Sequence, residues 1–170
     1  MKDRMLTVQE WHRKQAVQNF NATWDLIEKV DRTTEDDLQM IHTAHASRYH
    51  WGEIGTPVEF VRGEWQISRV YALVGMSESA LYHAKHCLEI CTDNQIGDFD
   101  LAFAYEAIAR AYRVTKNDRL MKTYLEKANK AAKDIEKQED RDYFMSELIT
   151  IIKSRQDNKP NVYSGSSTSV

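Results

Sequence analysis

The stretch HTAHASRYHW, His42–Trp51, gathers three histidines, an arginine, a tyrosine and a tryptophan, the side chains from which catalytic and metal sites are often built. His42 and His45 are three residues apart, so on a helix they share a face and can bind one metal ion. A second such pair, His83 and His86, follows later in the chain. Neither pair has the glutamate of the HExxH or ExxH motifs, so the sequence disfavours a metal site, and no cofactor is expected.

A helical wheel places His45 and Arg48 among apolar residues, whereas Thr43 and Ser47 on the opposite side are expected to face water. A buried arginine is costly unless it is paired, so Arg48 requires a partner inside the fold. Glu64 is the expected partner. The alternatives are Asp98 and Asp100.

Two interpretations of this polar cluster stay open. In the first it is a small-ligand or metal-dependent site, with Arg48 as anchor for an acidic group, His45 as proton donor or acceptor, and two tryptophans as walls. In the second it is a buried network that fixes how the first two helix pairs dock, which is the commoner role of such residues. The members of the polar cluster are His42, His45, Arg48, Trp51, Glu64 and Trp65.

The composition indicates one all-α domain. The chain has 170 residues, 42% of them hydrophobic and 29% charged, with only six glycines and two prolines to break helices or form the turns of a β fold. A formal net charge of -3 argues against binding to nucleic acid or to an anionic membrane. No apolar run resembles a signal peptide or a transmembrane span, so a cytoplasmic location is expected, where Cys87 and Cys91 are small buried side chains and form no disulfide.

Local signals divide the chain into seven helices. Thr33 or Thr34 can cap the second, Thr56-Pro57 begins the third, and Gly75 ends it. Gly97 ends the fourth, and Asp98 is the expected cap of the fifth. The predicted ranges are 7–30, 34–52, 57–74, 77–94, 98–116, 118–136 and 138–154, within one domain over 1–155 that a flexible polar tail, 156–170, follows.

An internal repeat is the strongest pattern. The segments ISRVYALVGMSESALYHAKHCLEI and IARAYRVTKNDRLMKTYLEKANKA align at a constant offset of 41 residues. The alignment pairs Tyr71 with Tyr112, Gly75 with Lys116, Ala80 with Met121 and Cys87 with Ala128. A tyrosine before the turn, then small residues where helices cross, is typical of tetratricopeptide-like helix pairs, although Lys116 and Met121 depart from that pattern.

Three stretches, HASRYHWGEIGTP, RGEWQISRVYALVG and IGDFDLAFAYEAIARAY, resemble the signature of a group of uncharacterised bacterial tetratricopeptide (TPR)-like proteins over roughly residues 20–130. The resemblance implies a bacterial helical-repeat protein and no particular activity. The expected fold is an all-α, TPR-like right-handed stack of antiparallel helix pairs, three pairs and a final capping helix.

In such a stack the first helix of each pair lines a groove, and polar strips on two of these helices predict a binding surface for a peptide or protein. The groove residues are Arg62, Gln66 and Arg69 on one helix, with Glu106, Arg110 and Arg113 on the next. Arginines there can hold carboxylates. The alternative is a solvated face. Because GxSxG, P-loop and GxGxxG motifs are absent, the function is expected to be non-catalytic binding of an unknown protein or peptide, with a homodimer as a further possibility.

Overall fold

The computed structural model describes residues 5–153, and this part of the chain is all helical, as the sequence predicts. Its α-helices are α1 (Val8–Glu28), α2 (Thr34–Ile54), α3 (Pro57–Leu73), α4 (Ser77–Asp93), α5 (Asp98–Val114), α6 (Asp118–Ala131) and α7 (Gln138–Lys153), with a short 3-10 turn, η1 (Ala132–Asp134), before α7. The predicted tail, 156–170, lies outside the described residues. Within them, none of the helices has the length and apolar character needed to cross a membrane.

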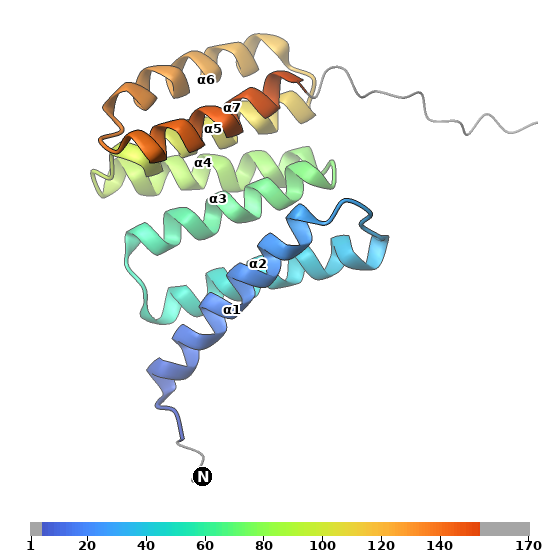
Figure 1. The fold of residues 1–170 in the computed structure, drawn as a ribbon, viewed down its shortest axis with the longest axis vertical. Helices are drawn as coiled ribbons and strands as arrows, with labels where there is room; N and C mark the ends of the chain where they lie inside the picture. The colour runs from blue at the N-terminus through green and yellow to red at the C-terminus, as the bar shows by residue number, and fades with distance from the viewer. Residues whose placement is uncertain (1–4, 154–170) are drawn as a thin grey trace, which may run out of the picture.

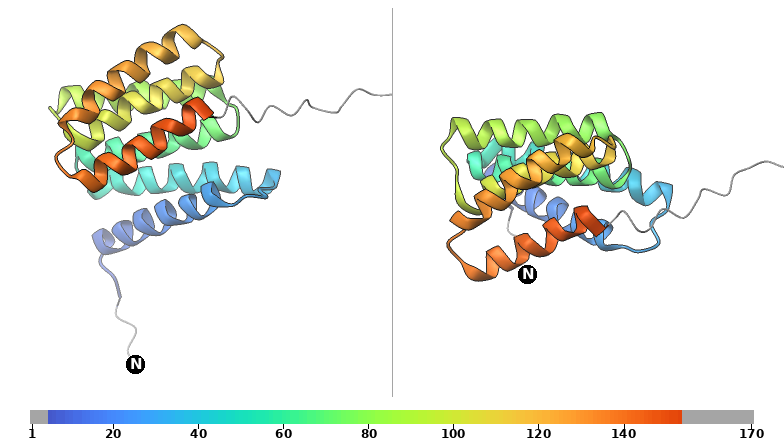
Figure 2. Two further views of the ribbon diagram at one scale, coloured as in Figure 1. Left: turned by 45° about the horizontal axis from the view of Figure 1, so that its top comes forward. Right: turned by 90° about the horizontal axis from the view of Figure 1, so that it is seen from above.

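The helices form a stack of antiparallel neighbours (Figure 1). The pairs α1–α2, α3–α4 and α5–α6 are joined through packing of α2 on α3 and of α4 on α5. In addition, α3 packs directly against α5, and α7 returns to pack on α5. Helices α1 and α7 therefore lie on the same side of the layer that α3 and α5 form (Figure 2). We call this side the inner face.

The helix ends follow mostly from local chemistry. Thr33 caps α2, because its backbone N–H donates to Asp36 over 2.8 Å while its hydroxyl accepts from the Asp36 N–H. Thr56 precedes Pro57 at the start of α3, as predicted. At α5 the prediction is wrong by one position: Gly97 is the cap, and Asp98 is the first helical residue with a φ of 53°.

The turns that end α3 and α5, at equivalent positions of the 41-residue repeat, have similar backbone geometry, which the turn that ends α4 at Gln95 also adopts. Gly75 and Lys116 both adopt the left-handed conformation, with φ of 78° and 59°. Glycine enters this region freely, whereas a lysine does so at a cost. The bonds that close the turns run from the N–H of Met76 to the carbonyl of Tyr71 (2.9 Å) and from the N–H of Asn117 to the carbonyl of Tyr112 (3.0 Å).

The core continues through the stack. A large apolar cluster joins α3, α4, α5, α6 and α7, and includes both cysteines as free, buried thiols. A smaller cluster lies between α2 and α3, around Met40 and Ile67. The repeat-related positions behind the two turns, Ala80, Cys87, Met121 and Ala128, are all buried.

The first helix pair contradicts one expectation from the helical wheel. Thr43 and Ser47 do not face water but are buried against α1. The Thr23 hydroxyl donates to the Thr43 hydroxyl over 2.8 Å, and the Ser47 hydroxyl donates to the carbonyl of Ala16 over 2.9 Å. Small hydroxyl side chains that find such partners allow two helices to approach closely, so their polarity does not indicate exposure here.

Candidate functional site

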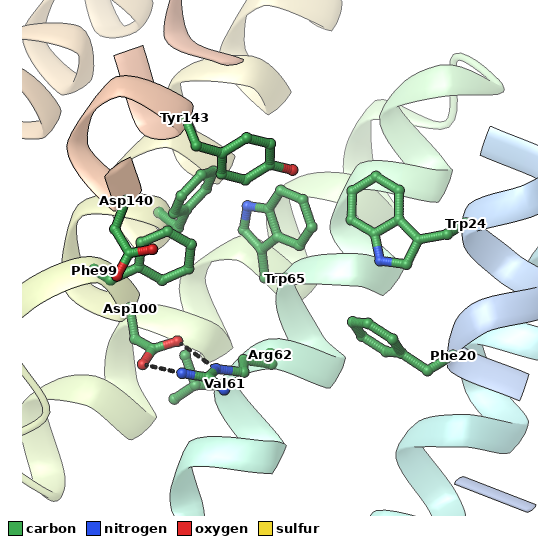
Figure 3. A pocket seen from close by; sticks show the side chains of 10 residues that line it. Phe20, Trp24, Val61, Arg62, Trp65, Phe99, Asp100, Asp140 and Tyr143 are labelled. Carbon is green, nitrogen blue, oxygen red and sulfur yellow. Dashed lines mark hydrogen bonds and ion pairs between the residues drawn. The ribbon is translucent and has the colours of Figure 1, made fainter. Parts of the chain in front are cut away.

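A pocket of about 490 Å³ opens on the inner face, where α1, α3, α5 and α7 meet (Figure 3). We call it the inner pocket. Each of the four helices contributes side chains, so it exists only in the assembled stack. Its lining residues are Phe20 and Trp24 of α1, Val61, Arg62 and Trp65 of α3, Phe99, Asp100 and Phe103 of α5, and Asp140 and Tyr143 of α7.

Aromatic rings form a continuous wall around the inner pocket. The rings of Trp24 and Trp65 lie 5.7 Å apart between centroids, and Trp65 meets Phe103 edge to face at 5.3 Å. Phe103 contacts Phe99 at 4.6 Å and Tyr143 at 5.9 Å. Trp65 and Phe103 are buried, whereas 44% of Tyr143 is exposed at the rim. The wall therefore offers ring faces and edges to a bound group.

An ion pair lies beside this wall. Arg62 binds Asp100 with two parallel hydrogen bonds, Nε to Oδ1 over 2.9 Å and Nη2 to Oδ2 over 3.2 Å (Figure 3). The hydrogen bond to Asp100 raises the pKa of Arg62. The Asp100 side chain is nearly buried, with 13% exposed, so its charge is held in place by the arginine.

Behind the wall, a buried carboxylate joins α3 to α5. Glu106 is fully buried; its Oε2 accepts from Trp65 Nε1 over 2.9 Å and its Oε1 from Arg110 Nε over 2.7 Å. Arg69 Nη2 pairs with Glu147 Oε2 of α7 at 3.1 Å. Burial, together with the nearby charge of Arg110, lowers the pKa of Arg69. Two carboxylates thus balance two arginines beneath α7.

The structure separates the six predicted groove residues. Only Arg62 lines the inner pocket. Gln66 is fully buried, and its side-chain amide donates to the carbonyl of Phe20 over 3.0 Å. Arg113 lies in the last turn of α5, away from the pocket lining. The other three, Arg69, Glu106 and Arg110, form the network beneath α7. Helix α7 covers Arg69 and Arg110, and carboxylates of the fold, Glu147 and Glu106, already pair with these two arginines.

The expected pairing of Arg48 with Glu64 is present on the opposite side of α3. Arg48 Nε donates to Glu64 Oε1 over 2.9 Å, and the guanidinium lies 4.5 Å from the centre of the Phe60 ring. His83 of α4 binds the other oxygen, with 2.6 Å between Nδ1 and Oε2. Burial acts most strongly on the Glu64 pKa and raises it, but the bond with His83 and the charges of His83 and Arg48 outweigh burial, so the pKa is lowered.

The remaining members of the predicted polar cluster are dispersed. His45 is exposed rather than internal; its Nε2 lies 3.0 Å from the Tyr71 hydroxyl, and its ring centroid 5.4 Å from that of His83. His42 is exposed as well. The two tryptophans are elsewhere: Trp51 lies under the Arg13 guanidinium, and Trp65 lies on the inner face. We call Arg48, Glu64, His83, His45 and Tyr71 the outer cluster.

In the described residues, no group of three or more histidine, cysteine, aspartate or glutamate side chains is arranged to hold a metal ion. Both oxygens of Glu64 are occupied by side chains of the fold. The outer cluster is therefore an internally bonded network that joins α2, α3 and α4.

Sequence reasoning missed most of the inner pocket, although a signal was present. Phe20 and Trp24 are four residues apart, as are Phe99 and Phe103, so each pair lies on one helix face. Such pairs are also typical of ordinary cores, and only the packing of four helices shows that these rings border a cavity. Comparison of the chain with protein-family models, with curated proteins and with solved structures finds no match in any of the three.

Proposed function

We propose that this protein is a non-catalytic interaction module that binds a peptide segment of a partner protein in the inner pocket. The observation that carries the proposal is the pocket itself: four helices from three successive pairs and the final helix converge on one open, aromatic-lined cavity. An open pocket with an apolar wall and a few fixed polar groups is suited to binding the side chains of a peptide segment. It is less suited to catalysis, which favours a site closed to water.

Its size supports a side chain rather than a whole domain as the inserted group. A volume of about 490 Å³ lies in the range of small-ligand sites, so it can admit a large side chain but not a folded domain. Binding energy at interfaces concentrates on a few anchors in such pockets. The exposed rim residues Arg62 and Tyr143 would then contact the flanking backbone of the segment.

The wider assignment belongs to the same proposal. The 41-residue repeat and its matching turns support a TPR-like helical-repeat protein, which the resemblance suggests is bacterial and which we expect in the cytoplasm. A small-ligand or metal site at His42, His45, Arg48 and Glu64 is the weaker alternative, because Glu64 is already fully engaged.

The proposal can be tested by selecting peptides from a random display library on the wild-type protein. The selected peptides are then measured against Tyr143→Ala and, as a matched control, Tyr82→Ala, whose side chain is 69% exposed on α4. We expect Tyr143→Ala to weaken binding about tenfold, as for an interface anchor, and Tyr82→Ala to leave it unchanged. Enrichment of no peptide, or equal binding to both variants, would refute an inner-pocket function.

A further inference from the structure

We infer that the inner pocket selects a basic side chain, a lysine or an arginine, as the anchor of the segment it binds. This inference rests on the proposed function and adds the chemical class of the anchoring group. Two features of the pocket carry it: the aromatic wall, and the carboxylate of Asp140, which forms no hydrogen bond or ion pair within residues 5–153.

The aromatic wall attracts cations. Ring faces carry partial negative charge, and a cation within about 6 Å of a ring centre is stabilised, most of all by tryptophan. Trp24 and Trp65 stand side by side in the pocket, with Tyr143 above them and Phe20 below (Figure 3). In this arrangement an alkyl stem can lie along rings while its charged end meets ring faces and edges.

The charged side chains at the pocket also favour a positively charged ligand. The negative charge of Asp100 is balanced by Arg62, which donates two hydrogen bonds to its carboxylate. Asp140 also lines the pocket; within residues 5–153 it forms no hydrogen bond or ion pair, although its charge adds to the effect of Asp100 in raising the pKa of Arg62. The three charged residues at the pocket, Arg62, Asp100 and Asp140, therefore leave one negative charge in excess.

An acidic anchor is disfavoured by the same geometry. To bind a carboxylate, Arg62 would have only the N–H groups that Asp100 does not occupy, and the bound acid would lie beside the negative charges of Asp100 and Asp140. The deeper arginines, Arg69 and Arg110, are held by Glu106 and Glu147 beneath α7. A basic anchor requires none of these pairs to break.

The test uses acetylated pentapeptides that are alanine at every position except the centre, which is arginine, citrulline, leucine or glutamate. Citrulline is the neutral counterpart of arginine with nearly the same shape. Binding is followed by NMR at the indole N–H signals of Trp24 and Trp65, with Trp11 as a reference remote from the pocket lining. The variant is Asp140→Asn, and the control is Asp142→Asn, two positions along α7 and bonded to Gln138.

We expect the arginine peptide to bind about tenfold more tightly than the citrulline peptide, and Asp140→Asn to weaken only the arginine peptide, by about threefold. Asp142→Asn should change neither affinity. Equal affinity of arginine and citrulline, or preference for leucine or glutamate, would overturn the basic anchor while leaving a peptide site in place. Absence of any shift at both pocket indoles would also overturn it, and the library selection then decides whether the proposed function survives.

Discussion

Trp65 and Glu106 lie 41 residues apart, the offset of the internal repeat, just before its two aligned segments, and their side chains are hydrogen bonded across the α3–α5 contact over 2.9 Å. The repeat thus places a donor in one unit and a charged acceptor in the next. Because Glu106 is fully buried and Trp65 lines the inner pocket, this bond connects the wall of the pocket to the ion-pair network behind it. Stability and pocket shape consequently depend on the same carboxylate.

Replacing that carboxylate should be severely destabilising. Glu106→Ala leaves Arg110 without its charged acceptor and removes the acceptor of Trp65, so we expect a loss of about 3–5 kcal/mol in the free energy of unfolding. Glu106→Gln keeps the shape and one acceptor oxygen, and should cost less. Chemical denaturation measures both, with Glu89→Ala, a 69% exposed side chain, as control. A cost below about 1 kcal/mol for Glu106→Ala would contradict a structural role for the network.

A substitution in the turn after α5 is expected to stabilise the protein. Lys116 adopts a φ of 59°, where a side chain costs about 1–2 kcal/mol that glycine does not pay, and its repeat equivalent is Gly75. We therefore expect Lys116→Gly to stabilise the protein by roughly 0.5–1 kcal/mol after the flexibility of glycine in the unfolded chain is included.

Lys116→Ala is the matched control, because alanine keeps the unfavourable backbone without the long side chain. The reverse change, Gly75→Ala, should be destabilising although its new Cβ would meet no atom within 4 Å. Thermal unfolding compares the three variants. Stabilisation by alanine equal to that by glycine would show that backbone conformation is not the cause.

Gly63 permits the close contact between α2 and α3. A Cβ at this position would lie 2.6 Å from Arg48 Cδ and 3.3 Å from its Cβ. Arg48 cannot move aside freely, since Glu64 and the Phe60 ring hold its guanidinium. Gly63→Ala should therefore cost about 1–3 kcal/mol.

Gly97→Ala serves as the control for that substitution, because its Cβ would have nothing within 4 Å. Urea denaturation of the two variants gives the comparison. If Gly63→Ala is as stable as Gly97→Ala, the outer cluster adapts to the methyl group and does not fix the distance between the helices.

We expect the protein to lose stability in mild acid because of two histidines, His45 and His50. His45 is exposed as a residue, but partial covering of its ring and the charge of His83 lower its pKa. Partial burial and the charge of His12 lower the pKa of His50. Both folded-state pKa values lie below the unfolded value of about 6.5, so the unfolded state binds protons first. Their contribution to stability is complete above that value and is lost as the pH falls through the folded pKa values.

The free energy of unfolding should accordingly be lower at pH 5.5 than at pH 8. The ring nitrogens of His12 and His50 lie 2.9 Å apart, and two protonated rings cannot share that bond. A double variant, His45→Gln with His50→Gln, should show a flatter profile over this range. The lowered pKa of Glu64 acts in a separate, more acidic window, where its stabilisation is lost as the pH falls below about 4.5. An unchanged slope in the double variant would rule out these histidines.

The sequence by itself determined the elements and much of their connection. Caps such as Thr33, the Thr56-Pro57 start and the Gly75 stop act within four residues, so they could be identified without a structure. The constant 41-residue offset paired Gly75 with Lys116 and so aligned the two turns, although Lys116 lacks the local turn signal that a glycine gives. The pairing of Arg48 with Glu64 also followed from a simple requirement, because a sheltered arginine needs an acid.

Only the tertiary structure decided which faces meet. Polarity on a helical wheel could not show that Thr43 and Ser47 are buried, because small hydroxyls can be satisfied inside a helix contact. Nor could it separate Trp65 from Arg48: Arg48 of α2 pairs with Glu64 on the outer side of α3, whereas Trp65, the neighbour of Glu64 in sequence, lines the inner pocket. The inner pocket combines two short-range aromatic pairs, on α1 and α5, that are 79 residues apart in the sequence. Its cavity is set by how α7 returns onto α5. That return depends on long-range packing, which no local pattern encodes.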